Sequence, residues 1–168
     1  RLDSIGLPPR FGWSPVGRRL DPGATMPPIY EKGAHMHERL TLGSTARELG
    51  MFGEEVACLF LGERGYEILQ RNWRCAAGVA DIVAEKGGAV ALVEVKTRRA
   101  APGWGPCFPE ESVTAEKRNR YRRIAACWAA RFPGSGDIRF HVVAVRVVNG
   151  SSAYVKLFED PCMWDDAL

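Results

Sequence analysis

Apolar residues recur at helical spacing in two parts of the chain, and they alternate with polar residues or run together in five others. Thr45-Ala-Arg-Glu48 has the form of a capping box, and the apolar positions after it predict a helix from about 45 to 63. A second helix is expected over residues 114–131, where an apolar stripe runs through Tyr121. Five segments have the composition of β-strands: residues 66–73, 80–85, 89–97, 138–148 and 153–158. The order α-β-β-β-α-β-β predicts an α/β fold, with a mixed β-sheet flanked by helices.

In the N-terminal part of the chain, apolar residues follow neither the helical spacing nor the alternation of a strand. This part is rich in proline and glycine, so we expect a disordered N-terminal extension over 1–43, a folded domain over 44–160 and a C-terminal tail over 161–168. Met26 and Met36 lie inside the extension, which is compatible with an over-extended reading frame. Both the role and the authenticity of this segment stay open.

The composition is that of a water-soluble globular protein. Hydrophobic residues make up 46% and charged residues 26% of the 168 positions, and no apolar run approaches the roughly 18–20 residues that a membrane span needs. The five cysteines include no C-x-x-C pair, which argues against a zinc ribbon or a redox pair. Their odd number, with no apolar leader segment in the sequence, predicts reduced thiols in a cytoplasmic protein. The net charge of +3 permits a polyanionic partner without requiring one.

The candidate chemistry lies in the two expected strands that are joined by Gly87-Gly88. If these glycines form a two-residue hairpin turn, Asp81 lies directly opposite Glu94. Side chains alternate along a strand, so Lys96 shares a face with Glu94. The neighbouring positions are apolar, and acidic residues are unusual in so apolar a hairpin. Two carboxylates and an ammonium group are therefore expected to converge.

The opposed carboxylates predict a metal site. Like charges directly opposite each other destabilise a strand pair by up to about 1 kcal/mol, and by more where water is excluded. A hard divalent cation would relieve this repulsion, because two carboxylates with water molecules suit Mg²⁺. We therefore expect Mg²⁺ (or Mn²⁺) to be held by Asp81 and Glu94, with Lys96 acting on the attacking water or on a phosphate, which fits phosphodiester hydrolysis. The alternative is an exposed strand face on which Glu94 and Lys96 contact only solvent.

The second expected helix is strongly basic. Against the single acid Glu116 it carries six basic residues, which are Lys117, Arg118, Arg120, Arg122, Arg123 and Arg131. The first four of these, together with Arg98 and Arg99 in the preceding strand region, are predicted to contact the phosphates of a nucleic acid. Such contacts position the backbone and depend on salt and shape more than on base sequence. The alternatives are a solvated helix face or a surface for an acidic protein partner.

Several short motifs occur in order between about Arg47 and Phe158. They are Gly53-Glu54, Gly65-Tyr66-Glu67-Ile68-Leu69, Arg71-Asn72-Trp73-Arg74, Asp81-Ile82-Val83-Ala84, Val93-Glu94-Val95-Lys96-Thr97-Arg98 and Arg139-Phe140. On these residues the sequence resembles the YraN-like proteins of bacteria, an uncharacterised family related to archaeal Holliday-junction resolvases. The resemblance implies a restriction-endonuclease-like core of the PD-(D/E)xK type.

The same resemblance implies a function. Glu54, Asp81, Glu94 and Lys96 match the acidic and lysine residues of the resolvase-like nuclease site. This implies a Mg²⁺-dependent endonuclease that acts on branched or otherwise structured DNA. Resolvases act as two-fold dimers, so a homodimer is implied by analogy.

Two positions depart from the pattern of the family. Val79 stands where the family usually has a carboxylate, and the hairpin register would place this residue opposite Lys96. His141 stands where an aspartate usually follows Arg-Phe, and we interpret it as a structural histidine. The missing acid leaves a second hypothesis open, that of a catalytically decayed nucleic-acid-binding module of the same fold.

Overall fold

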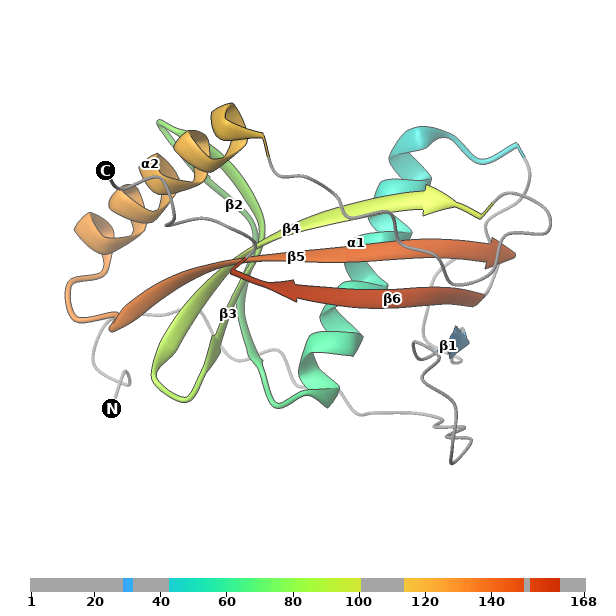
Figure 1. The fold of residues 1–168 in the computed structure, drawn as a ribbon, viewed down its shortest axis with the longest axis horizontal. Coiled ribbons are helices and arrows are strands. Elements are labelled where there is room, and N and C mark those ends of the chain that lie inside the picture. The colour runs from blue at the N-terminus through green and yellow to red at the C-terminus, as the bar shows by residue number, and fades with distance from the viewer. Residues whose placement is uncertain (1–28, 32–42, 101–113, 150–151, 161–168) are drawn as a thin grey trace.

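The computed structural model describes residues 29–31, 43–100, 114–149 and 152–160, which form one β-sheet with two helices (Figure 1). The elements are β1 (Ile29–Glu31), α1 (Ala46–Glu63), β2 (Glu67–Cys75), β3 (Gly78–Lys86), β4 (Ala89–Arg99), α2 (Ala115–Arg131), β5 (Asp137–Asn149) and β6 (Ser152–Glu159). The strand order in the sheet is β1-β6-β5-β4-β3-β2. Only β4 and β5 pair in parallel within this described sheet, so the sheet is mixed.

The predicted order of helices and strands is confirmed, with one addition. β1 is a three-residue strand inside the expected extension, and it pairs with β6 through Ile29 and Tyr154. Three residues are too few to show a two-residue alternation, which explains why the sequence pattern missed this strand. Residues 1–28, 32–42 and 161–168 lie outside the described residues, so the proposed domain boundaries stay predictions.

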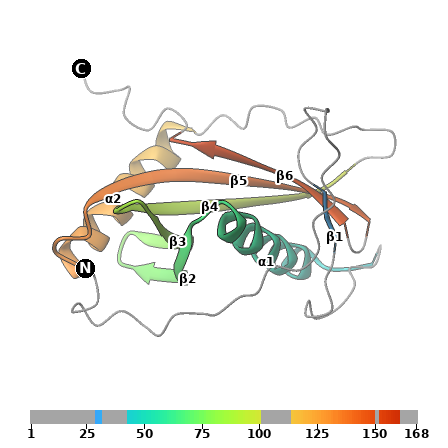
Figure 2. The same ribbon diagram turned by 90° about the horizontal axis from the view of Figure 1, so that it is seen from below.

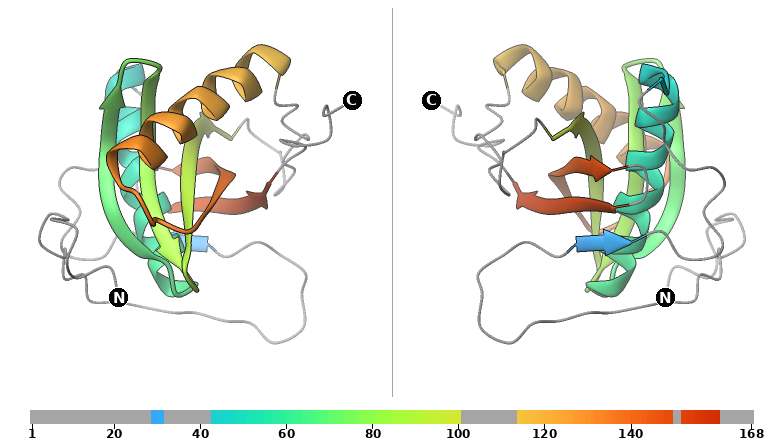
Figure 3. Two further views of the ribbon diagram at one scale, coloured as in Figure 1. Left: turned by 90° about the vertical axis from the view of Figure 1, so that its left-hand side faces the viewer. Right: turned by 90° about the vertical axis from the view of Figure 1, so that its right-hand side faces the viewer.

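The two helices cover opposite faces of the sheet (Figures 2 and 3). Because side chains alternate along a strand, neighbouring residues of one strand enter different cores. In β4, Ala91 and Val93 pack in the core under α1, whereas Val90 and Leu92 pack in the core under α2. Tyr121 is buried in the second core, as the apolar stripe predicted. Of the helices described, none is long and apolar enough to cross a membrane.

α1 begins at the predicted capping box and lies very close to β4. The N–H of Glu48 donates to Oγ1 of Thr45 over 3.2 Å, and the N–H of Thr45 donates to Oε2 of Glu48 over 2.5 Å. Further along the helix, a Cβ atom added to Gly53 would lie only 1.7 Å from Oγ1 of Thr97 in β4. The glycine therefore permits the close packing of α1 on the sheet, and this packing carries the next residue, Glu54, towards the sheet.

The β3–β4 hairpin has the predicted turn and the predicted register at its closed end. Gly87 and Gly88 have φ angles of 62° and 84°, as a type I′ turn requires. The pairing runs from this turn as far as Ile82 and Val93 and then stops. Beyond that point β3 stays paired with β2, while β4 continues beside β5. In Figure 1 the β2–β3 hairpin rises towards α2 and β4 runs to the right. We call this separation of β3 and β4 the fork.

Candidate functional site

Asp81 lies at the start of the fork, where its carboxylate replaces a missing backbone partner. In a continued ladder the N–H of Val95 would pair with Ala80. Instead it donates to Oδ2 of Asp81 over 2.8 Å. The ladder pair predicted between Asp81 and Glu94 does not form, because the pairing ends one position earlier. The two carboxylates therefore lie on separate strands at the opening of the fork.

The β2–β3 hairpin changes face at the level of Asp81. Asn72, in the middle of β2, has a positive φ of 51°, a conformation that breaks the alternation of a strand and that Asn adopts more easily than most residues. Arg71 before it forms an ion pair with Glu54 of α1, whereas Trp73 after it packs against α2. This change of face allows groups from both sides of the sheet to approach the fork.

Glu94 is held by three donors from one side of α2. The hydroxyl of Tyr121 donates to Oε2 over 2.6 Å, and Nη2 of Arg120 donates to the same oxygen over 3.2 Å. Nζ of Lys117 lies 2.5 Å from Oε1. Because the Glu94 side chain is only 14% exposed, these contacts replace most of its water. Burial and the neighbouring Glu94 charge raise the pKa of Tyr121 far above its ordinary range, so the hydroxyl stays protonated and donates.

Glu54 approaches the fork from the other side of the sheet. Its Oε2 accepts a hydrogen bond from Nδ2 of Asn72 over 2.9 Å and lies 3.5 Å from Nη2 of Arg71. The side chain is 20% exposed, and α1 can place it here because Gly53 packs directly on β4. β2 therefore supplies the groups that orient and partly neutralise this carboxylate.

The carboxylates of the fork act on one another electrostatically. The pKa of Asp81 is raised to about 6, first by burial and then by the charges of Glu94 and Glu54. The hydrogen bond from Val95 and the charge of Lys117 oppose this rise in the pKa. The three acids, which come from α1, β3 and β4, thus share one electrostatic environment.

Comparison with known proteins agrees with the sequence motifs. The profile of the uncharacterised protein family UPF0102 matches residues 53–145, a range that includes all three acids of the fork. The chain belongs to the UPF0102 family. This is the YraN-like family that the motifs indicated.

Individual UPF0102 proteins are similar over most of their own length. One from Nocardia farcinica (strain IFM 10152) is 48% identical over 103 residues, which cover 61% of this chain and 79% of the relative. One from Clavibacter michiganensis subsp. michiganensis (strain NCPPB 382) is 40% identical over 117 residues, covering 69% of this chain and 97% of the relative. One from Roseiflexus castenholzii (strain DSM 13941 / HLO8) is 46% identical over 101 residues, covering 59% and 79%. These names state no activity.

Lys96, the lysine of the predicted site, follows Glu94 on the side of β4 that faces α2. It is half-buried and lies beside Ala144 of β5. Val79 pairs with Arg74 of β2 and not with Lys96, because β3 has already separated from β4 at this position. The expected pairing of position 79 with the lysine is therefore corrected. A carboxylate at this position would have Arg74 as its cross-strand neighbour.

The basic residues predicted to bind phosphate on α2 fall into two pairs. Lys117 and Arg120 turn inward to Glu94. Arg118 and Arg122 are half-buried on the same helix, and Nη1 of Arg122 donates to Oδ1 of Asn119 over 3.0 Å. Sequence reasoning placed all four in one phosphate-binding group, whereas the structure separates them by what they contact.

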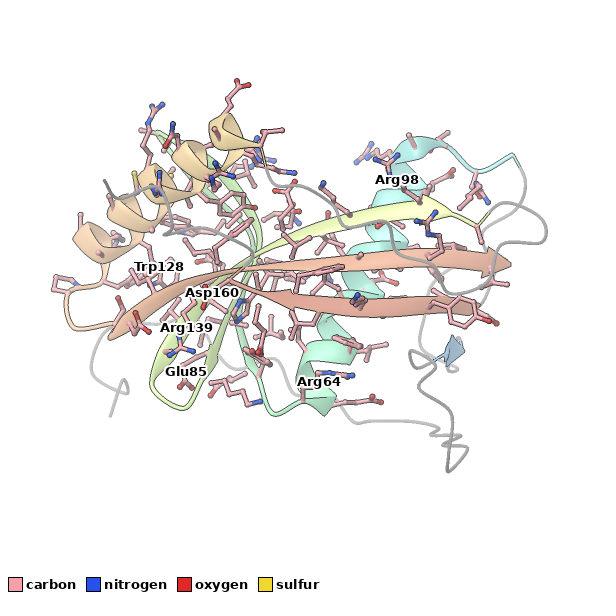
Figure 4. The ribbon with its side chains drawn as sticks, in the orientation of Figure 1. Arg64, Glu85, Arg98, Trp128, Arg139 and Asp160 are labelled. Carbon is pink, nitrogen blue, oxygen red and sulfur yellow. The ribbon has the colours of Figure 1, made fainter. Side chains whose placement is uncertain are left out.

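Arg98 and Arg99 lie at the far end of β4, near the start of α1. Arg98 is exposed there (Figure 4). Nη2 of Arg99 donates to the backbone carbonyl of Ser44 over 3.3 Å. The structure therefore does not bring these two residues to the basic side chains of α2, and any phosphates that they contact would lie further along a bound strand.

His141 is a structural histidine, as interpreted from the sequence. It is 3% exposed and lies in β5 beside Val93 of β4. Its Nε2 lies 3.2 Å from the hydroxyl of Tyr66, and its Nδ1 lies 2.8 Å from the carbonyl oxygen of Phe140. These polar partners satisfy the buried ring.

Sequence reasoning missed two residues that position the acids. The apolar stripe accounts for the ring of Tyr121 but not for its hydroxyl, and a buried tyrosine hydroxyl needs a hydrogen-bond partner. The motif that contains Asn72 gives it no role, although asparagine is several times more frequent than most residues at positive φ. Each residue type indicates that a polar partner or an unusual backbone conformation is present. Neither indicates which residue the partner is.

Proposed function

We propose that this UPF0102 protein binds nucleic acid and is a metal-dependent endonuclease that hydrolyses phosphodiester bonds in structured DNA, with a restriction-endonuclease-like core similar to that of Holliday-junction resolvases. The observation that carries the proposal is the buried carboxylate of Asp81 at the fork, which feels the charges of Glu94 and Glu54, while Glu94 itself contacts the basic helix α2. Partly buried acids that raise the pKa of a neighbouring acid are a mark of functional sites. A basic helix next to such acids suits a phosphate backbone.

Mg²⁺ or Mn²⁺ fits the residues of the fork in its ligand chemistry. Oδ1 of Asp81 has no hydrogen-bond partner among the described residues, and this oxygen and Glu94 would hold the ion. Within the described ranges, no group of three or more acidic, histidine or cysteine side chains could hold a metal ion by itself. Mg²⁺ commonly takes one or two carboxylates and completes its shell with water and substrate phosphate. When bound, the ion would activate water and offset the charge on the phosphate.

The side chains of the protein would bind and orient the substrate. Nζ of Lys96, on the same strand face as Glu94, would donate a hydrogen bond that orients the attacking water or stabilises the charge on the phosphate. Glu54 would add negative charge to the fork and keep Asn72 in place. Phosphate contacts near the reacting bond would come from α2, and further contacts from the end of β4. The predicted phosphate-binding residues are Lys117, Arg120, Arg118, Arg122, Arg98 and Arg99.

A nucleic-acid-binding module without catalysis is the second candidate. Two observations favour it: Val79 lacks the acid of the family pattern, and Glu94 is already neutralised by Lys117 and Arg120. Such a module would bind DNA through the same basic residues. It would leave the phosphodiester bonds intact in Mg²⁺ and in Mn²⁺.

The test is incubation of the full-length protein with linear, flapped and four-way DNA in Mg²⁺ or Mn²⁺. Asp81→Asn and Lys96→Ala are expected to abolish cleavage and to retain DNA binding. Asp137→Asn is the matched control, because Asp137 is an exposed carboxylate of β5 that is paired only with Arg139 among the described residues. Cleavage by the parent and the control, lost in both site variants, would support the enzyme. Binding by all four proteins with cleavage by none would establish the second candidate.

A homodimer belongs to the proposal by analogy with the resolvases. Two copies related by a two-fold axis would present two forks to a branched DNA. Analytical ultracentrifugation with and without four-way DNA measures this directly. A monomer in both conditions would contradict the proposed dimer. It would not affect the proposal for the chemistry at the fork.

A further inference from the structure

The two cationic side chains that form ion pairs with Glu94 are also needed, in the proposed function, to bind a phosphate. Lys117 contacts Oε1, and Arg120 and Tyr121 contact Oε2, so both carboxylate oxygens are engaged. Phosphate binding requires the two cationic side chains, and cation binding requires the carboxylate. The ion pairs therefore block both ligands at once.

We infer that the ion pairs of Glu94 with Lys117 and Arg120 form a resting-state lock, which a nucleic-acid phosphate and a divalent cation open together. The inference rests on the proposed function and adds to it a rule of binding order. In the bound state the cation takes Glu94, and Lys117 and Arg120 turn to the phosphate. Each ligand removes the obstacle to the other, so each must raise the affinity for the other by the same factor.

Either ligand alone meets an unfavourable charge arrangement. A divalent cation that arrives first faces two positive groups, 2.5 Å and 3.2 Å from the oxygens it would bind. A phosphate that arrives first draws these groups away and leaves a carboxylate that is only 14% exposed without its counter-ions. Leaving a mostly buried charge unpaired is strongly unfavourable. When both ligands arrive, every charge keeps a partner of opposite sign.

The exchange requires only side-chain rotation. Tyr121 is 0% exposed and its ring packs 4.2 Å from the ring of Phe140, so its hydroxyl stays on Glu94 in both states. The side chains of Lys117 and Arg120 are 20% and 46% exposed. Both are long, and rotation about their χ angles carries the charged ends outward without moving α2. The lock can therefore open on the fold as it stands.

The wild-type protein is tested by measuring DNA affinity with and without cation. Fluorescence anisotropy of labelled four-way DNA, and of a linear duplex, is recorded at one ionic strength in EDTA, in Mg²⁺ and in Ca²⁺. A denaturing gel run after each titration checks that the DNA is intact. We expect the cations to tighten DNA binding on the order of tenfold, and DNA to tighten the binding of Mn²⁺ by a similar factor.

Two variants break these ion pairs, one by changing the carboxylate and the other by changing the two cations. Glu94→Gln keeps the size of the side chain and an oxygen for Tyr121 but frees the cations. Its affinity for DNA in EDTA is expected to rise towards the wild-type value in Mg²⁺ and to lose its response to cation. The double variant Lys117→Gln/Arg120→Gln frees the carboxylate, so without DNA it is expected to bind Mn²⁺ on the order of tenfold more tightly than wild type, as measured by electron paramagnetic resonance of free Mn²⁺.

Two controls separate the lock from a general effect of charge. Arg118→Gln/Arg122→Gln removes two positive charges of α2 and keeps Lys117 and Arg120, the two cations of the ion pairs with Glu94. It is expected to weaken DNA binding but to keep the full response to cation. Glu54→Gln removes one negative charge from the fork and leaves the ion pairs of Glu94 in place. Its DNA affinity in EDTA is expected to stay well below that of Glu94→Gln.

The outcomes separate the lock from the proposed function. The lock is overturned if wild type binds DNA equally well with and without cation, or if Glu54→Gln raises the affinity in EDTA as much as Glu94→Gln does. Cleavage of DNA by that same wild-type protein would leave the proposed function standing. Wild type that neither binds nor cleaves DNA in any condition would overturn the proposed function, and the lock with it. Thermal unfolding of each variant confirms that it is folded.

Discussion

The hydroxyl of Tyr121 donates a hydrogen bond to Oε2 of Glu94 over 2.6 Å. Tyr121 belongs to the core between α2 and the sheet, where Trp128 also lies (Figure 4). Glu94 belongs to the opening of the fork, where the sheet divides. A fully buried residue thus sets the position of a carboxylate that is proposed to be catalytic. The packing of α2 and the geometry of the site depend on each other.

Replacing Tyr121 by Phe is expected to weaken the site more than the fold. The ring still fills the core, but Glu94 loses its fixed donor. A hydrogen bond to a charged group contributes about 2 kcal/mol, so the free energy of unfolding should fall by about that amount. DNA cleavage should fall at the same time, because Glu94 is no longer held in one position. Urea unfolding and cleavage of four-way DNA measure the two effects.

Tyr66→Phe is the matched control for this prediction. The hydroxyl of Tyr66 also donates to a carboxylate, Glu159, over 3.0 Å, and the residue is 8% exposed. A similar loss of stability is expected, with cleavage and cation response unchanged, because Glu159 lies outside the fork. If both Phe variants lost cleavage to the same extent, the positioning role of Tyr121 would be wrong.

The contribution of Asp81 to the stability of the metal-free protein is expected to fall as the pH rises from about 4 to about 6. The pKa of Asp81 is raised from 3.8 to about 6, chiefly by burial, so the folded protein keeps this proton where the unfolded chain has lost it. Between these two pKa values the unfolded state binds fewer protons than the folded state, so a rise in pH favours unfolding. Above the folded-state pKa both states are deprotonated, and the pH has no further effect through this group. The contribution is about 2 kcal/mol, allowing for partial solvation of the carboxylate.

Asp81→Asn isolates this pH dependence because the amide does not titrate. Urea unfolding of wild type and variant, in EDTA and at pH values within and above the window, gives the difference in the free energy of unfolding. That difference should change steadily from about pH 4 to about 6 and then level off. Two pH profiles that run parallel throughout would show that the pKa of Asp81 is not raised in the folded state.

Two glycines of α1 are expected to respond in opposite directions to alanine. A Cβ atom at Gly53 would lie 1.7 Å from Oγ1 of Thr97, so Gly53→Ala must push α1 away from β4. A loss of about 2 kcal/mol in the free energy of unfolding is expected from this overpacking. Gly50 has no atom within 4 Å of the same position, so Gly50→Ala should gain about 1 kcal/mol from helix propensity. Chemical denaturation of the two variants measures both, and equal effects would contradict the close packing.

The positive φ of Asn72 makes this position sensitive to the shape of its side chain. Asn72→Gly keeps the backbone freedom and loses only the hydrogen bond to Glu54, which should lower the free energy of unfolding by about 1 kcal/mol. Asn72→Val adds the strain of a β-branched residue at a φ of 51°, about 2 kcal/mol more. Urea unfolding distinguishes the two variants. Equal stability of both would show that β2 relaxes to an ordinary strand conformation here.

Local patterns predicted the elements of this fold because each pattern acts over a few residues. The capping box at Thr45, the alternation in β4 and the turn at Gly87-Gly88 all appear in the structure where the sequence placed them. The register at the closed end of the β3–β4 hairpin follows from that turn. β1 escaped prediction because a three-residue strand is specified by its pairing with β6 and not by its own pattern.

The sequence by itself also named the acids of the candidate site, Asp81, Glu94 and Glu54, through their spacing and their place in the motifs. Tertiary structure alone decided how they are arranged and which groups contact them. β3 and β4 separate beyond Ile82, and α2 packs on the sheet through its buried apolar residues. Both features depend on contacts between segments that are distant in the sequence. A basic helix of one and the same sequence can face solvent, a ligand or a carboxylate. The sequence gives the charge of the helix, but only its packing determines which groups the basic side chains contact. That packing set two of its cations on Glu94.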